Sequence, residues 1–188
     1  MDKIVLDIET KNSFDEVGGR DNVKKLDVSV VGVYSYDQDK YIAFDENEMD
    51  KLSELLKKTQ LIITFAGERF DLPVLEKYLN FNIHAIGHFD ILAEIEKNLG
   101  RRISLGILAE ANVGAGKSSH GLEAIEMYKR GEIQKLKDYC LQDVKITKDI
   151  FELIKKQGYL WIPDRYSSRM MKLAIEYKEE ISSQNQLI

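Results

Sequence analysis

The sequence predicts an α/β domain built on a mixed β-sheet. Strand candidates come first, over residues 1–10, 28–36 and 40–44, and strand and helix candidates then alternate along the chain. The 188 residues suit one domain with a sizeable core, and a composition that is 44% hydrophobic and 31% charged is typical of a globular protein. No internal repeat or low-complexity linker divides the chain.

Charge and cysteine content narrow the possible functions. With 27 Lys plus Arg against 32 Asp plus Glu, the net charge is −5, so any binding of nucleic acid must be local rather than through a general basic surface. Cys140 is the single cysteine, which excludes an internal disulfide and indicates a reducing compartment. We expect no signal peptide, and no apolar run approaches the ~20 residues that cross a bilayer. A cytoplasmic protein with no membrane partner is therefore expected.

The strands are predicted from short apolar or β-branched runs that polar turns separate. The first run is followed by a polar loop or short helix over residues 11–26, and Asp37-Gln38-Asp39 is typical of a hairpin turn. The strands predicted on these grounds cover residues 1–10, 28–36, 40–44, 61–65, 83–89 and 159–163.

The helices are predicted from apolar residues at helical spacing. The longest pattern contains neither Pro nor Gly and is bracketed by Gly131 and Gly158. The tail from Arg165 has the pattern of an amphipathic helix, so we expect a domain over residues 1–164 with a helical extension over residues 165–188. The helices predicted in this way cover residues 47–58, 72–78, 91–98, 104–111, 132–157 and 165 onwards.

Two acids stand side by side on the first predicted strand. Because side chains alternate along a strand, Asp7 and Glu9 project from one side while Ile8 points into the core. Paired carboxylates at the end of a buried strand repel one another and lose hydration. A hard cation such as Mg²⁺ or Mn²⁺ between them removes that cost. The alternative is an exposed strand end that carries two solvated acids.

Two further acids lie where such a sheet could bring them to the same place. Asp71 follows the fourth predicted strand in the apolar segment Phe70-Asp71-Leu72-Pro73-Val74-Leu75, an unusual setting for a solvated carboxylate. Asp143 lies on the longest predicted helix, four residues after Tyr139, so the two share a helix face. For Tyr139 the alternative is a ring packed on an apolar helix face.

Together these motifs resemble those of the DEDD superfamily of 3′–5′ exonucleases. The resemblance rests on Asp-x-Glu-Thr in the first strand, Asp71 in its Phe-Asp-Leu-Pro context, and Tyr-x-x-x-Asp in a late helix. The tyrosine marks the tyrosine subtype, and Tyr-Cys-x-x-Asp-Val is most similar to the YprB-like group. The resemblance covers roughly residues 2–160. It implies a ribonuclease-H-like fold, with a five-stranded mixed β-sheet flanked by α-helices.

The same resemblance implies a site and an activity. Asp7, Glu9, Asp71 and Asp143 would hold two divalent cations, Mg²⁺ or Mn²⁺, and Tyr139 would position the attacking water. Two such ions about 4 Å apart suit an in-line displacement at phosphorus. A tyrosine pKa of about 10 favours positioning over general-base catalysis. The implied reaction is hydrolysis of single-stranded DNA or RNA from its 3′ end.

Thr10, Lys117 and Arg102 are the candidates for substrate binding. Lys117 lies in Gly114-Ala115-Gly116-Lys117-Ser118, which is similar to a phosphate-binding loop but lacks its first glycine and a preceding buried strand. We expect either a loop that contacts phosphate near the cleft or a plain solvated loop. Ala66 stands where related sequences usually carry Asn, which removes a side chain that touches the substrate strand but no metal ligand.

Two other residues have simpler interpretations. Asp90 is predicted to cap the helix that follows it, with a place near the cations as the alternative. Cys140 lies on the apolar stripe of the longest helix and is predicted to be core. Ala66 and the acidic composition leave a second function open, a nucleic-acid-binding module with weak catalysis. A third is a structure-specific endonuclease on the same fold.

Overall fold

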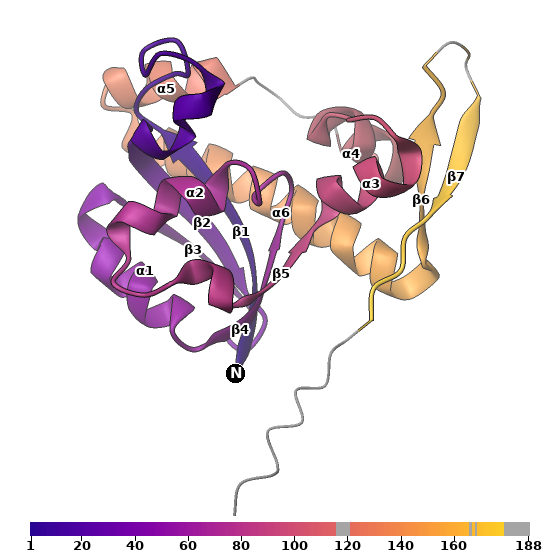
Figure 1. The fold of residues 1–188 in the computed structure, drawn as a ribbon, viewed down its shortest axis with the longest axis horizontal. Helices are drawn as coiled ribbons and strands as arrows, with labels where there is room; N and C mark the ends of the chain where they lie inside the picture. The colour runs from indigo at the N-terminus through magenta and orange to yellow at the C-terminus, as the bar shows by residue number, and fades with distance from the viewer. Residues whose placement is uncertain (116–120, 166, 168, 179–188) are drawn as a thin grey trace, which may run out of the picture.

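A five-stranded mixed sheet forms the centre of the computed structural model, which describes residues 1–115, 121–165, 167 and 169–178 (Figure 1). The strand order is β3-β2-β1-β4-β5. The pairs β1–β2 and β2–β3 are antiparallel, whereas β1–β4 and β4–β5 are parallel. Helices flank the sheet, so the predicted α/β architecture with a five-stranded mixed sheet is confirmed.

Most of the predicted elements are present, with shifts at their ends. The strands are β1 Asp2–Thr10, β2 Val28–Ser35, β3 Lys40–Asp45, β4 Thr59–Thr64, β5 Gly87–Asp90, β6 Tyr159–Pro163 and β7 Met170–Ala174. The α-helices are α1 Met49–Leu56, α2 Asp71–Leu75, α3 Ile91–Leu99, α4 Leu105–Val113, α5 Gly121–Lys129 and α6 Ile133–Gln157. Short 3₁₀ segments cover Arg20–Lys25, Glu46–Glu48, Glu76–Tyr78 and Ile83–Ala85.

Strand β1 divides its side chains between two cores. Ile4 and Leu6 pack in the core that α1 and α2 cover. Val5 packs in the core on the other face, together with Val144 and Phe151 of α6. Odd-numbered positions of β1 therefore face α6, as the alternation of side chains along a strand requires.

Helix α6 approaches the sheet closely where β2 carries Gly32, the residue paired with Asp7. A Cβ atom at this position would lie 2.9 Å from both Cys140 Sγ and Val144 Cγ2. Such a separation is shorter than real carbon contacts allow, so any side chain here would push α6 away from the sheet. The absence of a side chain at Gly32 thus permits the close approach of β2 and the middle of α6, next to Asp7 on β1.

We expect Gly32→Ala to lower both stability and activity. Overpacking of this kind costs about 1–3 kcal/mol, and the shift of α6 would carry Asp143 away from Asp7. Thermal unfolding and a nuclease assay measure the two effects. In a double-mutant cycle, Val144→Ala should relieve part of the clash, so the double variant should lose less than the sum of the single losses. Additive losses would contradict the close approach.

The tail shows the clearest departure from the sequence prediction. The prediction of a helix from Arg165 is wrong, because Met170–Ala174 forms strand β7 and pairs antiparallel with β6. Ile175 beyond it is fully buried, and the ring of Tyr177 lies 4.8 Å from that of Phe151. Pairing with β6 and burial of these side chains outweigh the weak helical pattern. The boundary at residue 164 stays a prediction, and residues 179–188 lie outside the described part.

Two smaller differences lie elsewhere. The strand expected over residues 83–89 begins only at Gly87, because Ile83–Ala85 forms a 3₁₀ turn that the side chain of Asn82 caps. Helix α5 was not predicted, and residues 116–120 before it lie outside the described part. Among the described residues, no helix combines the length and the apolar character needed to cross a membrane.

Candidate active site

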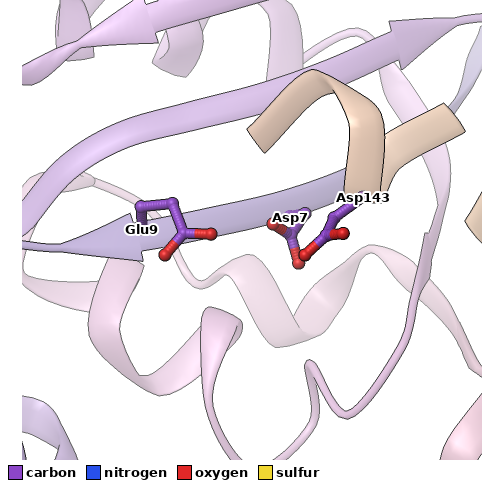
Figure 2. Close-up of side chains that lie close together, drawn as sticks. All are labelled: Asp7, Glu9 and Asp143. Carbon is purple, nitrogen blue, oxygen red and sulfur yellow. The ribbon is translucent and has the colours of Figure 1, made fainter. Parts of the chain in front are cut away.

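Three carboxylates converge where β1 passes under α6. Asp7, Glu9 and Asp143 each offer an oxygen, and these atoms lie within 4.8 Å of one another. Figure 2 shows the carboxylates of Asp7 and Asp143 turned toward each other, with Glu9 next along the strand. Glu9 and Asp143 are buried. The predicted pairing of the strand acids with the helix acid is therefore present in the structure.

The position of α6 follows from packing and from one ion-pair group. The helix packs along β1 and β2, and its buried side chains recur at helical spacing from Leu136 to Ile154. Near its N-terminus, Lys137 Nζ lies 3.0 Å from Asp45 and 3.4 Å from Glu48. These contacts fix the helix against the end of β3, so Asp143 is presented from a rigid element.

Asp71, at the start of α2, lies beside the same strand and contacts its backbone. Val5 is the last residue of β1 that pairs with β4, so the next part of that edge of β1 has no strand neighbour. Asp71 Oδ1 accepts a hydrogen bond of 3.1 Å from the Ile8 amide at this edge. The side chain is 3% exposed. It therefore lies against the backbone between Asp7 and Glu9, although it is not one of the three acids that cluster.

Burial raises the pKa of the Asp71 carboxyl well above its usual range, and the negative charge of Asp7 raises it further. The charge of Asp90 acts in the same direction, while the hydrogen bond from Ile8 opposes it. A cation near these groups would favour the ionised form, so binding of a cation and loss of a proton are linked here.

The turn that carries Asp71 is held by Asp90. As predicted, Asp90 caps α3, with Oδ1 accepting from the amides of Leu92 and Ala93 at 2.9 and 3.2 Å. The same carboxylate also accepts from the amides of Ala66 at 2.9 Å and Glu68 at 3.0 Å. One buried acid thus joins the end of β5, the start of α3 and the turn after β4.

Ala66 adopts a φ of 73°, in the left-handed region where few non-glycine residues lie. Asn tolerates this region far better than Ala does. An Asn at this position would therefore fit the backbone more easily than Ala does. In this chain the Ala66 amide donates a hydrogen bond to the Asp90 carboxylate, which helps to hold Ala66 in this conformation.

Cys140 is buried as predicted, but it also contacts the site. Its thiol lies 3.4 Å from the carbonyl oxygen of Asp7 and 3.6 Å from Asp7 Oδ2. Burial raises the pKa of the Cys140 thiol well above its usual range, and the nearby acids Asp7 and Glu9 add to this. The thiol therefore stays protonated and is a donor toward Asp7.

Tyr139 is buried, with 6% of its surface exposed, in an apolar cluster that includes Val30, Ala124 and Leu136. It does not line the cavity described next. The structure thus places Tyr139 one helical turn before Asp143, in the packed setting that the sequence left open as its alternative. Its role in positioning water stays a prediction.

A cavity of about 570 Å³ opens beside the acids. The acidic cluster forms part of its wall, and apolar side chains from loop 11–26, the segment before α2, and α5 form much of the rest. Its lining is Asp7, Ile8, Glu9, Thr10, Asn12, Ser13, Phe14, Asp15, Gly19, Arg20, Leu26, Phe70, Leu122, Ile125 and Asp143. The volume lies within the ~300–1,000 Å³ that is typical of ligand sites.

The three predicted substrate contacts have different outcomes. Thr10 lines the cavity, and its hydroxyl donates a 2.9 Å hydrogen bond to the carbonyl of Asn12. Arg102 does not line it, because its Nε lies 3.5 Å from Glu96 in a separate hollow near Ala66. Lys117 lies outside the described residues, so its contact stays a prediction.

The donor set fits a hard divalent cation. Carboxylate oxygens are the ligands that Mg²⁺ and Mn²⁺ prefer, and no histidine or thiol belongs to the cluster found among the described residues. Asp7, Glu9 and Asp143 could hold one ion. Asp71, buried against the Ile8 amide of β1, is the remaining candidate ligand.

Several residues at the site were not predicted from the sequence. Phe14, Arg20 and Leu122 line the cavity, and Cys140 contacts Asp7. One signal was available, because Phe14 is an aromatic residue in a mostly polar segment that ends in two glycines. The other contacts depend on how α5 and α6 lie against the sheet.

Comparisons with known proteins place this geometry in a family. A family model described as the RNase_H superfamily matches residues 4–155. The chain therefore belongs to the RNase H superfamily, whose fold implies a nucleic acid as the ligand and points to phosphodiester hydrolysis. No curated protein matches the chain.

Solved structures show the same fold. The chain is similar to the family B DNA polymerase of the hyperthermophilic archaeon Pyrobaculum calidifontis, with a TM-score of 0.62 and 16% sequence identity. The similarity covers 82% of this chain and 24% of that one. The chain thus spans about a quarter of the polymerase chain, and at this identity the likeness concerns the fold alone.

Proposed function

We propose that this protein is a metal-dependent 3′–5′ exonuclease of the DEDD tyrosine subtype that hydrolyses single-stranded nucleic acid. One observation carries the proposal, the convergence of Asp7, Glu9 and Asp143 from a strand and a helix far apart in the sequence. Asp71, buried against the amide of Ile8, supplies the fourth acid. Membership of the RNase H superfamily supports a phosphodiester substrate.

In this proposal, the acidic residues bind the cations, and residues of α6 orient the groups at the site. Asp7, Glu9 and Asp143 would hold one divalent cation, and Asp71 would complete the set for a second. Bound cations would supply Lewis acidity that stabilises the attacking and the leaving oxygen. The Tyr139 hydroxyl would orient the attacking water, and the Cys140 thiol would keep the Asp7 carboxylate in place.

The shape of the cavity supports a single strand as the substrate. A cavity of about 570 Å³ is of the size that holds a small ligand, which suits the terminal nucleotides of one strand. Aromatic side chains in the wall suit bases of any sequence. A cytoplasmic location, with Cys140 kept as a free thiol, is part of the proposal.

A single-stranded oligonucleotide labelled at its 5′ end tests this function. With Mg²⁺ or Mn²⁺ we expect a ladder of products that shorten by one nucleotide at a time, and EDTA should abolish it. Cleavage rates on DNA and RNA oligonucleotides of the same sequence show which of the two the enzyme prefers. One internal cut would instead indicate an endonuclease. Binding without any product at saturating Mn²⁺ would indicate a binding module.

A further inference from the structure

Negatively charged side chains outnumber positively charged ones in the wall of the cavity beside the acids. Among the described residues, Arg20 is the single lysine or arginine in its wall, against four carboxylates. A nucleic-acid strand is a polyanion, so its entry into this cavity requires positive charge from bound cations or from the protein. Arg20 is the residue of the cavity wall that offers such charge.

The backbone brings Arg20 to this position through a tight loop. The chain leaves β1, and the amide of Gly19 donates a 2.7 Å hydrogen bond back to the carbonyl of Phe14. Gly18 and Gly19 have φ values of 84° and 112°, a region that glycine adopts at little cost. The loop therefore reverses, and Arg20 returns next to Phe14 at the start of the 3₁₀ segment.

Aromatic packing then holds the side chain of Arg20. Its Cζ lies 5.2 Å from the centroid of the Phe14 ring, a contact that orients a guanidinium over an aromatic face. Phe14 in turn packs against Phe70, with 5.8 Å between ring centroids, and Phe70 directly precedes Asp71. The guanidinium is thus fixed relative to the segment that carries Asp71.

The guanidinium is also available to a ligand. Within the described segments Arg20 forms no ion pair, and its side chain is exposed. The planar fork of an arginine matches two oxygens of a phosphate, whereas a lysine offers only a point charge. An oriented and exposed arginine at the mouth of an acidic cavity is suited to a phosphodiester group.

We propose that Arg20 is a positioning residue that binds a backbone phosphate of the single strand in the cavity. The proposal rests on the proposed function for the identity of the ligand. Phe14 serves as the support that holds the guanidinium flat, and the Gly18-Gly19 turn sets its reach. Arg20 offsets part of the repulsion between the strand and the four acids of the wall.

Binding of a fluorescein-labelled single-stranded oligonucleotide tests the proposal. Anisotropy is measured in Ca²⁺, an oxygen-binding cation of looser geometry than Mg²⁺, across a series of salt concentrations. We expect Arg20→Gln to bind about tenfold more weakly and to lower the magnitude of the salt slope by about 0.7, the value for one phosphate contact on a single strand. Arg20→Lys should restore the slope and part of the affinity.

A matched control comes from the end of α5. Arg130 pairs with Glu132 at 3.2 Å and does not line the cavity, so Arg130→Gln removes the same charge elsewhere and should leave affinity and slope unchanged. In turnover assays, Arg20→Gln should raise KM with little change in kcat, which is the signature of lost uniform binding. Thermal unfolding checks that each variant is folded.

The outcomes separate this proposal from the proposed function. Equal losses in Arg20→Gln and Arg130→Gln, an unchanged salt slope in Arg20→Gln, or no binding by the unsubstituted protein would overturn the role of Arg20. Binding that depends on Arg20, in a protein that never cleaves, would support the role and overturn the exonuclease. Cleavage that is insensitive to Arg20 would do the reverse.

Discussion

Asp143→Asn should abolish nuclease activity, with a loss on the order of 10³-fold, the scale on which removal of one electrostatic contact to the reacting group acts. The substitution keeps the size of the side chain but removes one of three clustered carboxylates, so the site would hold its cation weakly. Initial rates of nucleotide release in Mn²⁺ measure the loss. The variant should also lose the rise in thermal unfolding temperature that Mn²⁺ gives the unsubstituted protein.

Asp138→Asn is the matched control, because Asp138 lies on the same helix, is exposed, and accepts a 2.9 Å hydrogen bond from the side chain of Gln134. It should retain full activity. Equal losses in the two variants would indicate a general effect on α6. Full activity in Asp143→Asn would exclude Asp143 from the cation site and, with it, the exonuclease proposal.

Asp71→Asn should separate stability from function. The folded pKa of Asp71 is raised above its unfolded value, so the unfolded chain releases the proton first as pH rises. Stability is then lost between the usual carboxyl pKa of about 4 and the raised folded pKa. Without cations, the Asn variant lacks this loss, so its stability relative to the unsubstituted protein should rise by about 1.4 kcal/mol for each pH unit between the two pKa values. For a protein of this length, each 1 kcal/mol of added stability raises the unfolding temperature by roughly 2–4 °C.

Unfolding temperatures in EDTA and in Mn²⁺, between pH 5 and pH 8, test this expectation. The advantage of Asp71→Asn in EDTA should grow with pH, and Mn²⁺ should stabilise the unsubstituted protein more than the variant. Asp71→Ala is the contrasting variant, because it leaves the Ile8 amide without its acceptor and should be less stable at every pH. If Asn and Ala destabilise equally at pH 8 in EDTA, the charge of Asp71 is not the source of the cost.

Local periodicity made the central part of the site predictable. Alternation along the first strand placed Asp7 and Glu9 on one face, and the structure confirms this because Val5, on that face, packs with α6. Helical spacing placed Tyr139 and Asp143 on one face of the longest helix, and both are buried there. Patterns of this kind depend on the backbone alone, so they survive into the folded protein.

Local patterns could not predict the features that depend on contacts between helices and strands. Asp71 bonds to Ile8 only because β4 stops pairing with β1 at Val5, and strand lengths of this kind are not written in local sequence. The tail was expected to be helical but pairs with β6, since an available strand edge outweighs a weak propensity. The position of Arg102 likewise depends on such a contact, because its side chain pairs with Glu96 outside the cavity, and its substrate role stays a prediction.

The corner built around Asp90 has a consequence for the cation site. Its carboxylate accepts four amide hydrogen bonds from two segments, which ties the turn after β4 to the start of the helix it caps. Asp71 lies five residues beyond Ala66, so the hydrogen bonds that hold this turn also position Asp71. The chain's own hydrogen bonds therefore hold Asp71 beside Ile8, so binding of a cation there should demand little movement of this acid.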